Sequence, residues 1–131
     1  MIAAALLALA AIEANQAEPA QPAQPIGITR TDLQQHDLGI AGWQAIQTRV
    51  DFEPGAVAPR HMHPGEEMIY VLKGTIEYRL DGQPRVILKP GDVLFIPYGK
   101  PHEAVNVGLE PASELATYVV EKDKPLVTPV P

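Results

Sequence analysis

The residues best suited to chemistry are three histidines and one glutamate in the middle of the chain. His61 and His63 are two positions apart in a segment with the pattern of a β-strand, so their side chains project from the same face, about 7 Å apart at the backbone. Two imidazole nitrogens at that spacing can bind one metal ion. Glu67 begins the apolar segment that follows, and His102 follows a turn over residues 97–101. The histidine pair alone also fits two hydrogen-bonded structural histidines, so the surrounding residues must decide.

Two spaced patterns surround these residues. The first, G-x5-H-x-H-x3-E-x6-G, is formed by Gly55, His61, His63, Glu67 and Gly74. The second, G-x5-P-x-G-x2-H-x3-N, is formed by Gly91, Pro97, Gly99, His102 and Asn106. Together they resemble the paired sequence motifs of the cupin superfamily at every specified position, and residues 75–90 separate them.

The resemblance implies a small jelly-roll β-barrel of the cupin type. Inside it, His61, His63, Glu67 and His102 would bind one divalent metal ion. Gly55, Gly74 and Gly91 would lie at strand ends, where a bulky side chain would obstruct the turn. Asn106 would support a turn or the ligands rather than bind the metal itself.

Three imidazoles and one carboxylate suit manganese, iron, cobalt, nickel, copper or zinc. The chain has no cysteine, so any metal must be held by nitrogen and oxygen. Glu67 is also the candidate catalytic residue, because it could leave the metal and take a proton from the substrate.

The implied function is a metal-dependent dioxygenase or a related oxidoreductase that acts on a small chelating substrate, either aromatic and phenolic or enolic. A less specific resemblance to flavonol-dioxygenase-like cupins favours the phenolic class. The alternative is a cupin that binds a metal or a small ligand without catalysis, or acts as a sensor. A cavity too small for a ring beside the metal would favour this alternative. A sugar epimerase or isomerase ranks last, because only Arg49 and Arg60 are near enough in sequence to bind a phosphate.

The elements that must position these residues are short β-strands. From residue 26 onward, short apolar runs alternate with Gly and Pro, and no stretch keeps an apolar period of 3.6 residues. Alternation over residues 44–52 predicts a half-buried strand with Ile46, Thr48, Val50 and Phe52 on one face. Further strands are predicted over residues 68–72, 75–80, 85–88, 92–96 and 114–120, with a hairpin turn at Asp81-Gly82. The proline-rich tail over residues 125–131 suits an edge position or a surface wrap.

Apolar side chains are the candidate lining of the barrel, as core residues first and substrate contacts second. They are Ile69, Val71, Val93, Phe95, Ala104, Phe52 and Tyr118. Arg49 and Arg60 could steer an anionic substrate to the mouth, although outward solvation is the simpler interpretation for Arg60. Trp43 and Tyr70 could pack a dimer face, where aromatic residues are enriched.

The first 25 residues are a separate segment, ahead of a single barrel domain over residues 26–131. Ile2 to Ile12 form an apolar run of eleven residues. The run is too short to cross a bilayer, which needs roughly 20 residues, but it matches the apolar core of a signal peptide. No Lys or Arg precedes Arg30, so the usual basic leader is missing. Two interpretations stay open: a signal peptide of a periplasmic or secreted protein, or an Ala-rich helix of a cytoplasmic one. An Ala-Gln-Pro linker follows over residues 19–25.

Length and charge limit the partners. The 131 residues suit one domain, and the net charge of −6 comes without any cluster of Lys or Arg. A nucleic-acid partner is therefore not expected, since binding phosphates requires a concentrated basic face. We expect a small-molecule ligand, no integral membrane span, and a homodimer, which is the usual assembly for a barrel of this size.

Overall fold

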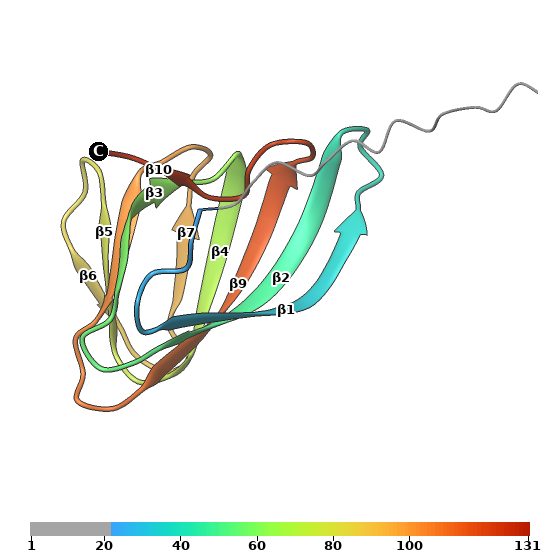
Figure 1. Cartoon of the computed structure of the whole chain (residues 1–131). Coiled ribbons are helices and arrows are strands. Elements are labelled where there is room, and N and C mark those ends of the chain that lie inside the picture. Colours follow the sequence, from blue (N-terminus) through green and yellow to red (C-terminus); the bar gives the residue numbers. More distant parts are fainter. Residues whose placement is uncertain (1–21) are drawn as a thin grey trace, which may run out of the picture.

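The computed structural model describes residues 22–131, and all regular structure in that part of the chain is β-strand. Ten strands form two antiparallel sheets of five strands each (Figure 1). The first sheet has the order β1 (Ile28–Asp37), β2 (Trp43–Phe52), β9 (Ala112–Glu121), β4 (Gly65–Lys73) and β7 (Val93–Ile96). The second has the order β10 (Thr128–Pro129), β3 (Val57–Met62), β8 (His102–Asn106), β5 (Ile76–Leu80) and β6 (Val86–Leu88). The predicted all-β jelly-roll barrel is confirmed.

The core lies between the two sheets and follows from alternation along each strand. On β2, Ile46, Thr48, Val50 and Phe52 are buried, as the sequence pattern predicts. On β4, the buried residues Glu67, Ile69 and Val71 alternate with exposed Met68, Tyr70 and Leu72. Because side chains alternate between the faces of a strand, the phase that buries Ile69 also turns Glu67 into the barrel.

Gly55, Gly74 and Gly91 lie beside strand ends, as expected from the motifs. The physical reason that each position requires glycine differs. Gly55 and Gly91 have φ angles of 76° and 89°, and a Cβ atom at either would meet nothing within 4 Å. Glycine is therefore favoured at these two positions by the left-handed backbone conformation, and not by a lack of room for a side chain. At Gly74 both apply, because φ is 75° and a Cβ would lie 2.6 Å from Cβ of Ala112.

Two features of the fold differ from the sequence expectation. β1 was not predicted, and it pairs with β2 along most of its length. Val93 and Phe95, which the sequence suggested as barrel lining, point outward from β7 and are 69% and 56% exposed. The pairing of Met68 with Phe95 explains this, since directly paired residues share a face and Met68 is outward.

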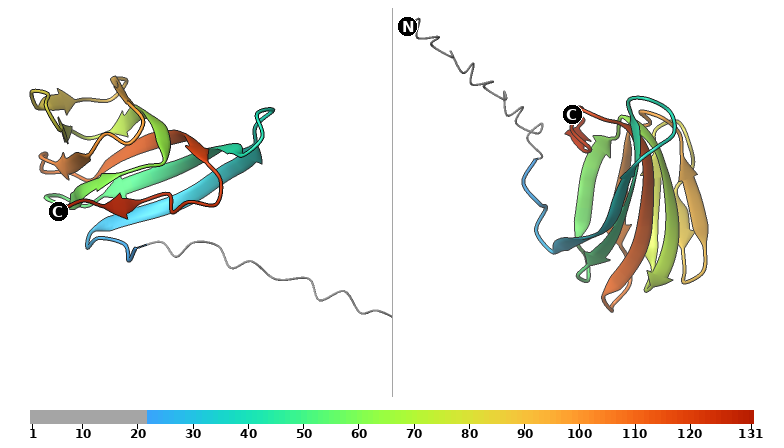
Figure 2. Two further views of the ribbon diagram at one scale, coloured as in Figure 1. Left: turned by 90° about the horizontal axis from the view of Figure 1, so that it is seen from above. Right: turned by 90° about the vertical axis from the view of Figure 1, so that its right-hand side faces the viewer.

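The C-terminal segment folds back over the second sheet. Figure 2 shows it beside β3, and Thr128 and Pro129 pair there with Met62 and His61. The tail therefore takes the edge position that its prolines favour. Of the predicted leader and linker over residues 1–25, residues 1–21 lie outside the described part of the chain, and residues 22–25 carry no strand or helix. In the described part, no helix is long and apolar enough to cross a membrane.

Candidate metal centre

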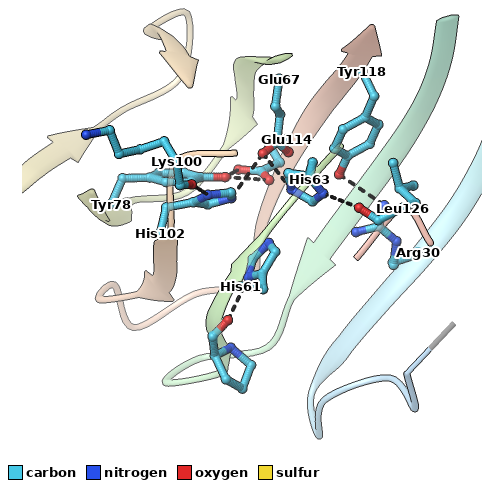
Figure 3. A network of polar contacts seen from close by, with 11 residues as sticks. Arg30, His61, His63, Glu67, Tyr78, Lys100, His102, Glu114, Tyr118 and Leu126 are labelled. Atoms are coloured by element: carbon cyan, nitrogen blue, oxygen red, sulfur yellow. Dashed lines mark hydrogen bonds and ion pairs between the residues drawn. The ribbon is translucent and has the colours of Figure 1, made fainter. Parts of the chain in front are cut away.

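Both sheets contribute side chains to one point inside the barrel (Figure 3). His61 is the last residue but one of β3, and its backbone pairs with that of His102, the first residue of β8. His63 follows one residue beyond β3, and Glu67 reaches the same point from β4 in the other sheet. The turn between β3 and β4 therefore brings Glu67 close to His61 and His63.

The three imidazoles form a compact group, which we call the imidazole cluster (His61, His63 and His102). One ring nitrogen of each lies within 4.8 Å of those of the others. The ring centroids are 4.3 Å apart for His61 and His102, 4.9 Å for His61 and His63, and 5.1 Å for His63 and His102. His63 and His102 are buried, whereas His61 is partly exposed.

Each ring of the cluster is oriented by a backbone carbonyl. Nδ1 of His61 lies 2.6 Å from the carbonyl oxygen of Pro59, and Nδ1 of His102 lies 2.9 Å from that of Lys100. Nδ1 of His63 lies 2.6 Å from the carbonyl oxygen of Leu126, in the C-terminal segment. A carbonyl can only accept, so each Nδ1 carries a proton, and Nε2 is the ring nitrogen available to a metal. This is the arrangement that supports histidine as a metal ligand.

Glu67 lies against the cluster through one carboxylate oxygen. Its Oε2 is 3.0 Å from Nε2 of His63 and 3.1 Å from Nε2 of His102. Nevertheless, Oε2 of Glu67 and Nε2 of His63 are buried atoms without a hydrogen bond of acceptable geometry in the described part of the chain. Buried polar atoms normally have a partner, and a divalent cation would satisfy both of these. The residues present therefore fit a metal ion.

Charge states differ among the residues at this point of the barrel. Burial, reinforced by the neighbouring His102 and His63, lowers the pKa of His61 to about 4, so this imidazole is neutral at pH 7. Burial disfavours the charge of Glu67, but the adjacent His63 and His102 outweigh it and hold the pKa of this carboxyl well below its usual range. For His102, burial is outweighed by its contact with Glu67, which raises its pKa. A cation would have to displace the proton that Glu67 favours on His102.

A second set of polar groups lies in the same cavity beyond the cluster. Glu114 of β9 is buried, and the Tyr78 hydroxyl lies 2.7 Å and 2.8 Å from its two oxygens. Burial, with the charge of Glu67 adding to it, raises the pKa of Glu114 to about 8, so this carboxyl is largely protonated at pH 7. Arg30 of β1 donates from Nη2 to the Tyr118 hydroxyl at 3.0 Å.

These groups line an open cavity of about 1050 Å³ that also contains His61, Glu67 and His102. Its apolar walls come from both sheets and the tail. They include Ile28, Ile46, Val50, Phe52, Ala104 and Leu126. A volume of this size accommodates a ring-sized ligand beside the imidazole cluster.

The structure brings together all four sequence-predicted site residues, His61, His63, Glu67 and His102. Asn106 is a turn residue, since its side chain donates to the carbonyl of Glu110 at 2.8 Å and accepts from the Gly108 amide at 2.9 Å.

The two arginines suggested for steering are engaged elsewhere. Arg49 points outward and pairs with Asp51 at 3.0 Å, while Arg60 pairs with Asp81. Sequence reasoning missed Arg30, Tyr78 and Glu114 as cavity residues. Alternation along β9 could have predicted the position of Glu114, because Glu114, Ala116 and Tyr118 are two residues apart and all point into the barrel.

Comparison with known proteins places these features in a family. Residues 48–118, just over half of the chain, match the family described as Cupin domain. Among curated proteins, Germin-like protein 1 of Brassica napus is 37% identical over 75 residues, which are 53% of this chain and 36% of that protein. Dimethylsulfoniopropionate lyase DddQ of Ruegeria pomeroyi is 44% identical over 48 residues, 37% of this chain and 24% of that protein. The chain spans less than half the length of these relatives.

Solved structures show the same fold. DMSP lyase DddQ superposes with a TM-score of 0.60 at 29% identity, over 66% of this chain and 43% of that one. An oxalate oxidase superposes with a TM-score of 0.65 at 26% identity, over 82% of this chain and 57% of that one. The polyketide cyclase RemF of Streptomyces resistomycificus gives 0.64 at 28% identity, over 81% and 72%.

Proposed function

The chain belongs to the cupin family, and from that premise we propose that it is a metal-dependent oxidoreductase of the dioxygenase type. Its substrate would be a small chelating molecule with phenolic or enolic oxygens. The observation that carries the proposal is the imidazole cluster, in which every Nδ1 is bound to a carbonyl and Nε2 is the nitrogen available to a metal, beside a ring-sized cavity.

His61, His63 and His102 would hold the metal through Nε2, and Glu67 would complete the set through its carboxylate. Manganese, iron, cobalt, nickel, copper and zinc all accept such ligands. A bound metal would supply Lewis-acid chemistry and, if redox-active, electron transfer to dioxygen.

The chain's own residues would bind the substrate and move its proton. Apolar side chains such as Val50 and Phe52 limit water at the cavity wall. Oε2 of Glu67, which has no hydrogen bond in the described part of the chain, is placed to accept a proton from a substrate hydroxyl. Glu114, which is largely protonated and accepts from the Tyr78 hydroxyl, could donate a hydrogen bond to a bound ligand.

The relatives support an enzymatic role, since oxalate oxidase and DMSP lyase are both named for reactions. The volume of the cavity also favours a bound ligand over a metal that only stabilises the barrel.

The test is oxygen uptake by the metal-loaded protein with a panel of catechols and flavonols, comparing wild type with Glu67→Gln. We expect uptake by the wild type, and a loss of about 100-fold or more in the variant while its metal content stays close to that of the wild type. Glu66→Gln is the matched control, because it changes the neighbouring carboxyl on the opposite face of β4. Unaffected turnover in Glu67→Gln would remove the proton-transfer role.

A lyase is the second candidate, favoured by the similarity to DddQ over 48 residues. The two reactions differ in their need for oxygen, so substrate consumption that persists under anaerobic conditions would support the lyase. Metal and ligand binding without any turnover would indicate the non-enzymatic alternative.

We also propose a homodimer. The outer face of the first sheet carries an apolar patch, which we call the β4–β7 patch (Met68, Tyr70, Leu72, Val93 and Phe95). β7 is also the end strand of its sheet, so one edge of its backbone is unpaired in the described part of the chain. A second copy could pair with that edge and cover the patch.

A further inference from the structure

Arg30 lines the cavity from β1, and its guanidinium lies next to the Tyr118 hydroxyl (Figure 3). Its guanidinium donates to the Tyr118 hydroxyl at 3.0 Å, and its Cζ is 5.6 Å from the centre of the Tyr118 ring. The Tyr118 ring is in turn 4.8 Å from the ring of His63. The Tyr118 ring therefore neighbours both the guanidinium and the cluster, and Arg30 lines the same cavity as His61 and His102.

Arg30 is also the cation of the cavity that lacks a carboxylate partner in the described residues. The other basic side chains of the lining are paired: Arg60 with Asp81, Lys122 with Asp37, and Lys124 with Glu121. Arg30 makes no ion pair there, and the Tyr118 hydroxyl accepts its one hydrogen bond. A guanidinium has five N–H donors in a planar fork, so most of them remain for a ligand.

In the described residues, no acidic group of the cavity forms an ion pair with Arg30, although Glu67 and Asp32 attract its charge at longer range. Glu67 lies against His63 and His102, and Glu114 is bonded to Tyr78. Asp32, on the same strand as Arg30, is exposed and attracts the guanidinium only at longer range. The unused donors of the Arg30 guanidinium therefore remain available to an anionic group of a ligand.

We propose that Arg30, positioned by Tyr118, binds a carboxylate of the substrate while the chelating oxygens of the same molecule face the imidazole cluster. The substrate is then a small chelating carboxylic acid, and this inference rests on the proposed function. A carboxylate matches the fork of one guanidinium with two parallel hydrogen bonds. Phosphate at neutral pH carries more negative charge than one guanidinium neutralises.

The experiment measures the binding of two catechols that differ only in charge, 3,4-dihydroxybenzoate and its neutral amide, 3,4-dihydroxybenzamide. Calorimetric titrations use the metal-loaded, full-length chain at constant ionic strength. We expect the wild type to prefer the carboxylate by about 10- to 100-fold, the contribution typical of a charge-assisted bidentate contact. Arg30→Gln should reduce this preference to about one while metal content is unchanged, and Arg30→Lys should keep part of it.

Arg49→Gln is the matched control, because it removes the same charge from the outer face of the barrel. Tyr118→Phe removes the acceptor that positions Arg30, and it should lower the preference by a few-fold without removing it. Competition by inorganic phosphate reports whether the subsite is instead a phosphate site; displacement of the benzoate at equal concentration would overturn the carboxylate assignment.

A preference that survives in Arg30→Gln, equal binding of both probes to the wild type, or no binding of either would also overturn the inference. The proposed function fails separately, through absence of metal or of oxygen uptake. If the wild type holds metal and consumes oxygen but binds the benzoate and the benzamide equally well, only the role of Arg30 is refuted.

Discussion

Glu114 is a carboxyl group buried in the cavity wall with the Tyr78 hydroxyl as its hydrogen-bond donor. Burial is the main reason that its pKa rises to about 8, with a contribution from the charge of Glu67. An unfolded chain releases this proton near pH 4.5. The folded state therefore holds one more proton between these values, and the stability gained from neutral Glu114 is full below about pH 4.5 and is lost as the pH rises through about 8.

Glu114→Gln should remove this pH dependence, because glutamine keeps the neutral state and an acceptor for Tyr78. In metal-free protein, we expect the wild type to lose stability relative to the variant between pH 5 and 8, by an amount on the order of a few kcal/mol. Thermal denaturation across that range is the measurement, and exposed Glu53→Gln is the control. Parallel pH profiles for wild type and Glu114→Gln would contradict the prediction.

At the scale of elements, the C-terminal segment is part of the site. The carbonyl of Leu126 orients the ring of His63, and the pairing of β10 with β3 holds the segment beside His61. The amide of Val130 adds a hydrogen bond to the Arg60 carbonyl at 3.1 Å. Removing the segment leaves the histidine in the sequence but takes away the group that fixes its tautomer.

A chain that ends after Lys124 should therefore bind metal about 10- to 100-fold more weakly than the full chain, as expected when an orienting partner is lost. Competition with a chelator of known affinity measures this. A chain lacking only Val130 and Pro131 keeps the Leu126 carbonyl and should stay close to the wild type. Equal affinities for all three chains would contradict a role of the tail.

Strands that depend on tertiary pairing were the least predictable elements. β2 could be predicted because Ile46, Val50 and Phe52 alternate with polar residues. β1 carries mostly polar residues that face solvent, and the extended edge of β2 is what fixes it as a strand. Phe95 points outward because β7 pairs with β4 in a register that places Phe95 opposite Met68. Alternation within a strand of four residues does not reveal which of its faces is buried.

At the scale of the whole molecule, we expect the β4–β7 patch to lie in a homodimer interface. A charge in its centre would have to be buried without a partner, so Phe95→Lys should give a monomer. Leu109→Lys is the control, because Leu109 is 93% exposed and lies outside the patch. Light scattering after size-exclusion chromatography measures the mass. A wild-type monomer, or a dimer that survives Phe95→Lys, would contradict the proposed interface.

The site was predictable from sequence where its residues are close in the chain and not where they are distant. His61, His63 and Glu67 fall within one motif, and the second motif supplies His102. Cavity groups such as Arg30 come from strands outside both motifs, and their neighbours are set by the closure of the barrel. Arg30 and Tyr118 are 88 positions apart, and no local pattern connects them.

The central claim is that the imidazole cluster binds a metal ion, and elemental analysis of protein purified without an affinity metal tests it most directly. We predict about one divalent transition-metal ion per chain, and its loss in the double variant His61→Ala, His63→Ala. His36→Ala is the matched control, since His36 is exposed and lies outside the cluster. Wild-type protein that holds no metal, or a double variant that binds it equally well, would contradict the account.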